Sequence, residues 1–252
     1  MNYQSVRLPV LGLLLSTLVL ILPDTLLAAS PWSEKGTLLY QSPMRSPEDL
    51  KGWIMEGPGV AQFNKGWMEL LSPEESGHHV YWCPYSFPKS FVAQWQVQNL
   101  APEAGLVIVF FATSGLKGED IFDASLMPRD GTFDQYTLGD IKSYHISYYA
   151  NAAHNPARGH ANLRKNNTFT LLQQGKIGIP TQSLQVHDIT LVKDDAHISL
   201  FVDDRLVIDY TDNDGANGPA LRNGKIGFRQ MKWTHFRYRD FKVFALKPGS
   251  AN

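Results

Sequence analysis

The chain has 252 residues, one cysteine and a formal net charge of −1, from 23 basic and 24 acidic residues. A single cysteine cannot form an intrachain disulfide, so a small domain held together by disulfides is excluded. The balanced charge lacks the basic footprint of a nucleic-acid-binding protein, and we expect no nucleic-acid partner. With 43% hydrophobic and 12% aromatic residues, the chain can instead build a large core.

Residues 1–29 have the pattern of a secretory signal peptide. Arg7 precedes the apolar run Leu8–Leu22, and two alanines stand just before Ser30. This order is typical of a cleaved export signal, so we predict a periplasmic or secreted protein. No later segment has the roughly 20 apolar residues that a membrane span needs, and we expect no membrane partner after cleavage. Residues 30–252 are expected to form a single domain.

Short strand patterns, separated by Gly, Pro, Asn and Asp, fill the first half of that domain. The run LVIVFFAT at Leu106–Thr113 is continuous and apolar, which predicts a central strand buried on both faces. Pro84 and Pro88 are expected to prevent regular pairing after the strand His78–Cys83. One helical turn is expected around Ser46–Lys51. Further strands are predicted at Gly36–Gln41, Trp53–Glu56, Trp67–Leu71 and Phe91–Val97.

The second half adds strands without any sustained helical period. A meander is predicted at Val186–Lys193, Ala196–Val202 and Arg205–Tyr210, with Asp-rich hairpin turns between them. The fold class that follows is all-β, an antiparallel β-sandwich or jelly roll. Such sandwiches often bind ligands along the concave face of one sheet. The remaining predicted strands are Phe169–Leu172, Gly224–Gln230 and Thr234–Leu246.

The segment 139–167 gathers the most chemically capable side chains of the chain. Its strand pattern alternates with period two, which places Tyr144 and Tyr148 on one face and His145 and Tyr149 on the other. Polar-tipped aromatic residues on both faces favour a strand with one side lining a groove. We therefore predict a ligand site here. For any single residue, packing with only its polar tip in water is the simpler alternative.

Several unusual strings along the chain resemble one bacterial family. Together they are similar to the YesU-like jelly-roll family of undetermined function, in the concanavalin A-like lectin/glucanase superfamily. The resemblance spans roughly residues 53–246 and implies a concanavalin A-like fold and a carbohydrate-active setting, without a catalytic assignment. The strings are WIMEGPG (Trp53–Gly59), HHVYWCPYSFP (His78–Pro88), GEDIFDASLMPRDGTFDQY (Gly118–Tyr136), SYHISYYAN (Ser143–Asn151), NLRKN (Asn162–Asn166) and GKIGFRQM (Gly224–Met231).

The residue types near position 150 suggest a lyase acting on an acidic, uronate-containing poly- or oligosaccharide. β-Elimination needs cations that neutralise the uronate carboxylate, together with a base and an acid, often Tyr or His. In type, the set resembles the Arg/Gln/His/Tyr sites of jelly-roll alginate lyases, although their motifs are absent. The candidates for proton transfer are His145, Tyr144, Tyr148 and His79. The candidates for substrate binding are Arg158, Asn162, Arg164, Lys165, Gln94, Trp82, Tyr81 and Arg229.

Two alternatives remain open at this stage. The same surface would serve a carbohydrate-binding module without catalysis. A glycoside hydrolase would need two carboxylates, for which Glu119 and Asp123 are the candidates, although a turn explains them as well. We expect no cofactor and no metal site, with structural calcium in the oxygen-rich loop Asp209–Gly218 as a weak possibility. Cys83 is expected to be buried and unreactive.

Overall fold

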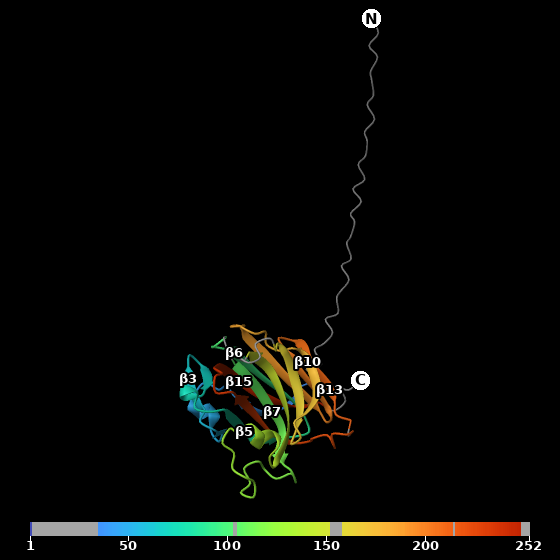
Figure 1. Ribbon diagram of the computed structural model, residues 1–252. Helices are drawn as coiled ribbons and strands as arrows, with labels where there is room; N and C mark the ends of the chain where they lie inside the picture. Colours follow the sequence, from blue (N-terminus) through green and yellow to red (C-terminus); the bar gives the residue numbers. More distant parts are fainter. Residues whose placement is uncertain (2–34, 103–104, 152–157, 214, 248–252) are drawn as a thin grey trace.

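The structure is a computed structural model with two antiparallel sheets packed face to face (Figure 1). The predicted β-sandwich is therefore confirmed. The signal-peptide prediction falls on residues outside the described part of the chain. Within the described part, no helix is long and apolar enough to cross a membrane. The structure describes residues 1, 35–102, 105–151, 158–213 and 215–247.

The first sheet, sheet A, has the strand order β13, β12, β11, β6, β15, β4 and β3, and β1 pairs with β15. The consecutive hairpins β11–β12–β13 are the predicted meander, and its turns use Asp195, Asp203 and Asp204 at positive φ. The strands are β1 (Lys35–Ser42), β3 (Val60–Asn64), β4 (Trp67–Leu71), β6 (Ser90–Asn99), β11 (Val186–Asp194), β12 (His197–Val202), β13 (Arg205–Thr211) and β15 (Phe236–Leu246).

The second sheet, sheet B, has the order β10, β9, β8, β7, β14, β5 and β2. Its strands are β2 (Ile54–Glu56), β5 (His79–Phe87), β7 (Gly105–Gly115), β8 (Ile141–Asn151), β9 (His160–Asn166), β10 (Thr170–Ile177) and β14 (Gly224–Gln230). The short helices are η1 (Pro47–Leu50), η2 (Pro73–Glu75) and α1 (Asp134–Thr137). The helical turn expected near residue 48 is thus present as η1.

The main core lies between the two sheets and is rich in aromatic rings. Phe228 of sheet B packs against Trp95 and Phe241 of sheet A, with ring centroids 5.3 and 5.4 Å apart. Burying one such phenylalanine side chain contributes roughly 1.5–3 kcal/mol to folding. As predicted, β7 is buried along nearly its whole length. Because the inward face of each sheet packs into this core, we expect a polar ligand site to lie on an outward face.

Three details of strand pairing differ from the sequence prediction. Strand β5 continues through Pro84, which lies in a register shift between the β14 partners Lys225 and Gly227, so the missing N–H breaks no regular ladder. Strands β3 and β9 were not predicted. A second register shift, in β7–β8 pairing, turns both Tyr148 and Tyr149 into the core, so Tyr149 does not share the outward face of His145.

The segment between β7 and β8, residues 116–140, covers part of the outer face of sheet B. Phe133 and Tyr136 from this segment pack over a second apolar cluster on that face. Gly227 leaves room for the indole of Trp82, because a Cβ at Gly227 would lie 2.3 Å from that ring. Trp82 Nε1 donates to Glu56 Oε2 at 2.8 Å. The same segment reaches His145 of β8, with the ring centroids of Phe133 and His145 6.1 Å apart.

Candidate functional site

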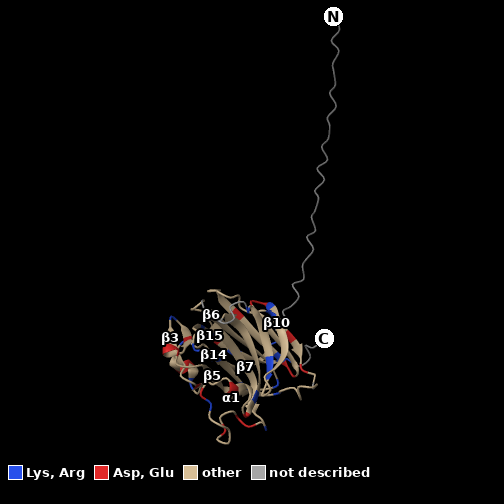
Figure 2. Cartoon of the chain, viewed as in Figure 1, with Lys and Arg blue, Asp and Glu red and all other residues tan. Residues whose placement is uncertain are grey.

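Two rows of paired residues cross the outer face of sheet B and bring distant parts of the chain together. Directly paired residues on neighbouring strands share one face of a sheet. Figure 2 shows basic residues among the strands between the labels β7 and β10. The first row contains Arg164, His145, Phe110 and Gly227, and the second contains Asn162, Ser147, Ile108 and Arg229.

Three arginines near these rows form what we call the arginine cluster: Arg158, Arg164 and Arg229. Arg158 Nη2 donates to Ser147 Oγ at 3.0 Å. The Arg164 guanidinium lies 4.1 Å from the ring centroid of Phe169, and its Nη1 donates to the Phe169 carbonyl oxygen at 2.9 Å. Arg158 and Arg164 are half-buried and reach solvent. The cluster is therefore open on the β9 side of the sheet.

Arg229 is the most unusual member of the cluster, because it is 0% exposed. Its guanidinium carbon lies 4.8 Å from the ring centroid of Phe133 and 5.2 Å from that of Tyr136. None of its three guanidinium nitrogens has a hydrogen-bond partner among the described residues. Burial lowers the pKa of Arg229 to about 10, so the group stays charged at neutral pH. A buried, unpaired cation is costly to folding.

The arginine cluster forms no ion pair with an acidic side chain of the described residues. Among the ion pairs of the described residues, none joins an Asp or Glu to Arg158, Arg164 or Arg229. By contrast, Arg129 in the covering segment is paired with Glu56, Nη2 to Oε1 at 2.8 Å. Within the described part of the chain, one arginine near this face is thus neutralised, and the arginine cluster is left without a counter-charge. Guanidinium groups in this state are suited to bind a carboxylate or another small anion.

His145 lies inside the same cluster and is 2% exposed. Burial, followed by the charges of Arg164, Arg229 and Arg158, lowers its pKa to about 3. Asn166 Nδ2 lies 3.0 Å from His145 Nδ1, so the amide can donate to this nitrogen. The imidazole is therefore neutral at physiological pH and adds no positive charge to the cluster.

We expect the His145 ring to resist protonation in a histidine NMR titration. Because its folded-state pKa is about 3, its ring resonances should stay constant from pH 8 to 4.5. In the Arg164→Met variant the midpoint should rise, since the second-largest cause of the depression is removed. A midpoint near the usual value of about 6.5 in the unaltered protein would contradict this account of the cluster.

Comparison with known proteins identifies the family. Residues 37–243 match the family described as Domain of unknown function (DUF1961). The chain is also 36% identical over 213 residues to the uncharacterized protein YesU of Bacillus subtilis (strain 168), covering 83% of this chain and 96% of YesU. The chain belongs to the DUF1961 family. The resemblance expected from the sequence strings is therefore confirmed.

Solved structures place this DUF1961 protein among galectin-like sandwiches. A protein of unknown function with galectin-like fold from Bacillus subtilis superposes with a TM-score of 0.80 at 36% identity, covering 84% of this chain and 97% of that one. The carbohydrate-binding module CBM66 from Bacillus subtilis gives 0.50 at 14% identity, covering 77% and 96%. The Ca2+/Man3GlcNAc-bound VIP36 exoplasmic/lumenal domain gives 0.57 at 11% identity, covering 85% and 92%. The last two share the fold alone.

Several residues that the sequence grouped with His145 lie instead in the interior of the sandwich. Tyr144 donates to Asp212 Oδ2, and Tyr148 accepts a hydrogen bond from Trp95 Nε1. Their strand alternates, so they face the core while His145 faces outward. Lys165, Tyr81 and His79 are buried too, and burial with the nearby charge of Arg229 lowers the pKa of His79 to about 4. We leave all five out of the candidate site: Tyr144, Tyr148, Lys165, Tyr81 and His79.

Two further predicted residues lie away from the arginine cluster. Gln94 is on sheet A, where its Nε2 donates to Thr190 and its Oε1 accepts from Lys35. Trp82 lies on the outer face of sheet B but is 0% exposed beneath the covering segment. Of the predicted binding residues, the structure therefore brings together with His145 only these described ones: Arg158, Asn162, Arg164 and Arg229.

Phe169 belongs to this site but was not predicted as part of it. It is 36% exposed, and its ring stacks on His145 with centroids 5.9 Å apart. It follows the polar string NLRKNNT, and an exposed aromatic residue directly after a basic strand is the signal that could have indicated it. Phe169 gives the cluster an apolar surface beside its charges.

The acidic candidates lie in the segment between β7 and β8 and act as turn caps. Glu119 Oε2 accepts from the Lys117 backbone N–H, and Asp123 Oδ1 accepts from Ser125 N and Oγ. Those bonds hold the pKa of the Asp123 carboxyl below its usual value. The turn explanation is therefore the one that the geometry favours for both residues.

Metal binding has no support in the described part of the chain. There, no three His, Cys, Asp or Glu side chains are grouped so as to hold a metal ion. In the loop considered for calcium, Asp212 is buried and bonded to Lys165. Cys83 is buried as predicted, and desolvation raises the pKa of its thiol to about 12.

Proposed function

We propose that this protein binds acidic saccharides, with a uronate carboxylate held by the arginine cluster on the outer face of sheet B. The observation that carries this proposal is the set of desolvated guanidinium nitrogens, on Arg229 and at Arg158 Nε, that have no hydrogen-bond partner in the described part of the chain. A carboxylate accepts bidentate hydrogen bonds from a guanidinium group and supplies the missing charge. Arg158 and Arg164 contact the ligand from the open side, and Arg229 adds positive potential from beneath.

The surroundings of the cluster suit a sugar ring better than a free inorganic anion. Phe169 offers a flat apolar surface next to Arg164, on which the C–H face of a pyranose can stack. Asn162 lies beside Arg158, and with its amide oriented to satisfy both groups its oxygen accepts from Arg158 Nη1 at 3.1 Å, which holds the guanidinium group in place. Solved structures whose descriptions name carbohydrate binding share this fold, which supports the same class of ligand.

The proposal is one of binding and does not include β-elimination. The titratable side chain placed within the cluster is His145, and a base with a pKa of about 3 removes a C5 proton poorly. The tyrosines first considered for this role, Tyr144 and Tyr148, are 0% and 1% exposed on the opposite face of β8. We also propose, from the pattern of residues 1–29, that binding takes place outside the cytoplasm.

Isothermal titration calorimetry with D-glucuronate and D-galacturonate tests the proposal, with D-glucose and D-galactose as partners that lack the carboxylate. We expect the uronates to bind and the neutral sugars to bind at least tenfold more weakly, because a charge-assisted bidentate contact contributes roughly 1.5–3 kcal/mol. The affinity should fall as salt is added, since part of the attraction is between partly exposed charges.

The Arg164→Met variant should lose most of the uronate affinity. Arg45→Met is the matched control, because Arg45 is exposed and pairs with Asp240 of sheet A, away from the cluster. Equal affinity for charged and neutral sugars, or equal losses in both variants, would overturn the assignment. Release of an unsaturated product that absorbs in the ultraviolet would show that binding is not the whole activity.

A further inference from the structure

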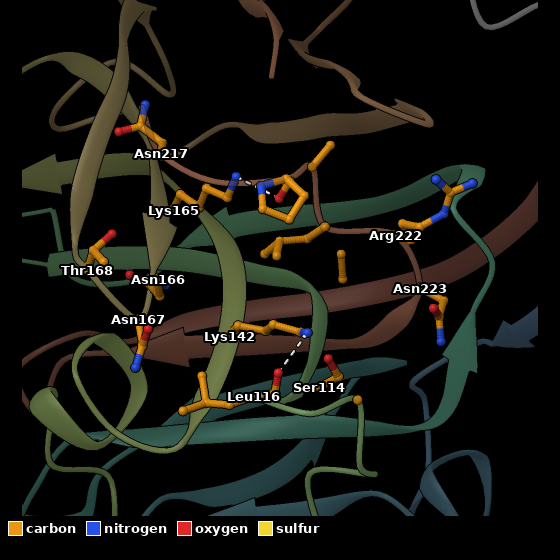
Figure 3. Close-up of a pocket in the computed structure, with 15 residues that line it drawn as sticks. Ser114, Leu116, Lys142, Lys165, Asn166, Asn167, Thr168, Asn217, Arg222 and Asn223 are labelled. Atoms are coloured by element: carbon orange, nitrogen blue, oxygen red, sulfur yellow. Dashed lines mark hydrogen bonds between the residues drawn. The ribbon is translucent and has the colours of Figure 1, made fainter. Parts of the chain in front are cut away.

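A cavity of about 440 Å³ opens at the end of the sandwich next to the arginine cluster (Figure 3). It lies where β7 and β9 end and where β8 and β14 begin, and its volume is within the range of roughly 300–1,000 Å³ seen for small-molecule sites. The lining residues used below are Lys142, Asn166, Asn167, Thr168, Arg222 and Asn223.

The cavity is basic and rich in hydrogen-bond donors. Lys142 extends across it toward the Leu116 carbonyl oxygen, to which its Nζ donates at 3.0 Å, and Arg222 lies on the opposite side (Figure 3). The Arg222 guanidinium is largely exposed, and Asp195 is 3.8 Å from it. Of the described residues that line the cavity, none is an Asp or Glu. A negatively charged ligand group is thus favoured here as well.

The β9–β10 turn forms a common wall between the cavity and the arginine cluster. Asn166 lines the cavity and is 2% exposed, and its Nδ2 donates to Ser143 Oγ at 2.8 Å and lies 3.0 Å from His145 Nδ1. Its Oδ1 is buried without a hydrogen-bond partner among the described residues. The same turn continues into Phe169, which stacks on His145 and Arg164. The two sites are therefore adjacent.

We propose that the two sites are subsites of one groove, so that the ligand is an acidic oligosaccharide with charged groups on at least two sugar units. This inference rests on the proposed function. One uronate carboxylate is held by the arginine cluster, and a second anionic group is held between Lys142 and Arg222. The amides of Asn166, Asn167 and Asn223 then meet the hydroxyls of the second sugar.

Calorimetry with galacturonate and its di- and trisaccharide tests this inference. The oligomers should bind the unaltered protein about tenfold more tightly than the monosaccharide, since the second anionic group gains contacts with both Lys142 and Arg222. The double variant Lys142→Met/Arg222→Met should reduce oligomer affinity to that of the monosaccharide and leave monosaccharide affinity unchanged. Lys51→Met/Lys65→Met, which removes the same charge from exposed residues of the β1–β2 and β3–β4 connections, should change neither.

The outcomes separate this inference from the proposed function. Equal binding of monomer and oligomers would overturn the second subsite and leave the arginine cluster standing. If the double variant still binds oligomers more tightly than the monosaccharide, the second subsite would also be overturned, because the extra contacts would then lie elsewhere. If neither the monosaccharide nor the oligomers bind, both the proposed function and this inference are refuted.

Discussion

Replacing Arg229 by methionine is expected to weaken uronate binding about tenfold or more while slightly raising the free energy of unfolding. The loss of binding follows from the missing positive potential, because a charge several ångströms from a carboxylate still contributes on the order of 1–2 kcal/mol at an effective dielectric constant near 20. Most single changes at a fully buried position destabilise a protein. This variant is expected to behave differently, because the native residue is a buried cation whose nitrogens have no hydrogen-bond partner among the residues that the structure describes.

Two opposing terms decide the effect of Arg229→Met on stability. The pKa of Arg229 is lowered from 12.5 to about 10, which corresponds to roughly 3 kcal/mol of desolvation penalty that the variant removes. The stacking of the cation on Phe133 and Tyr136 is lost, and this contributes up to about 2 kcal/mol. Methionine is of similar length and refills the space. A net gain of about 1 kcal/mol remains.

Urea denaturation monitored by tryptophan fluorescence measures this change. Arg229→Lys is the matched control, since it keeps the charge, loses the planar fork and should retain part of the affinity without any gain in stability. A decrease of 2 kcal/mol or more in Arg229→Met would show that Arg229 holds the fold together. In that case its lack of a partner would carry no argument for a ligand.

Lys165→Met is expected to have the largest effect on stability, lowering the free energy of unfolding by about 3–5 kcal/mol. Lys165 Nζ lies 2.6 Å from Asp212 Oδ2 and also donates to the carbonyl oxygens of Gly218 and Pro219 at 2.9 Å. Both members of the pair are buried, so removing the lysine leaves the Asp212 carboxylate in a dry environment, with the Tyr144 hydroxyl as a remaining hydrogen-bond donor among the described residues. Calorimetric melting should fall by about 10 °C.

Three comparisons make the Lys165 experiment decisive. The double variant Lys165→Met/Asp212→Leu should recover much of the loss, because it no longer leaves a buried charge. Lys89→Met, which breaks an exposed pair with Asp195, should change stability by less than about 1 kcal/mol. Monosaccharide binding should survive in Lys165→Met. If it were abolished while the fold remained intact, Lys165 would have to reach the monosaccharide, although it lies on the opposite face of β9 from Arg164 and is paired with Asp212.

Much of the sandwich is encoded locally in the sequence. The run LVIVFFAT became the central strand β7, since a continuous apolar stretch is stable only between two covered faces. The meander β11–β12–β13 could be predicted because Asp is common in hairpin turns and tolerates positive φ, which Asp195, Asp203 and Asp204 adopt here. Such features depend on residues close together in the chain, so no tertiary contact is needed to recognise them.

The errors arose where a distant partner decides the orientation of a side chain. Strand β9 was hidden because Lys165, a charged residue, points inward and is neutralised by Asp212, 47 positions later. Tyr144 looked like a proton donor on a groove, but its hydroxyl is satisfied in the core by the same Asp212. Nothing in the sequence around Arg229 indicates that its guanidinium nitrogens have no hydrogen-bond partner among the described residues. These contacts are set by the packing of two sheets and cannot be read from spacing.

A crystal structure of the protein with a galacturonate oligomer tests the central claim most directly. We predict that a uronate carboxylate lies about 3 Å from the guanidinium nitrogens of Arg158 and Arg164, with its sugar ring against Phe169. Density for the oligomer on sheet A near Gln94, or on sheet B with its carboxylates turned to solvent, would contradict the assignment of the arginine cluster as the anion site.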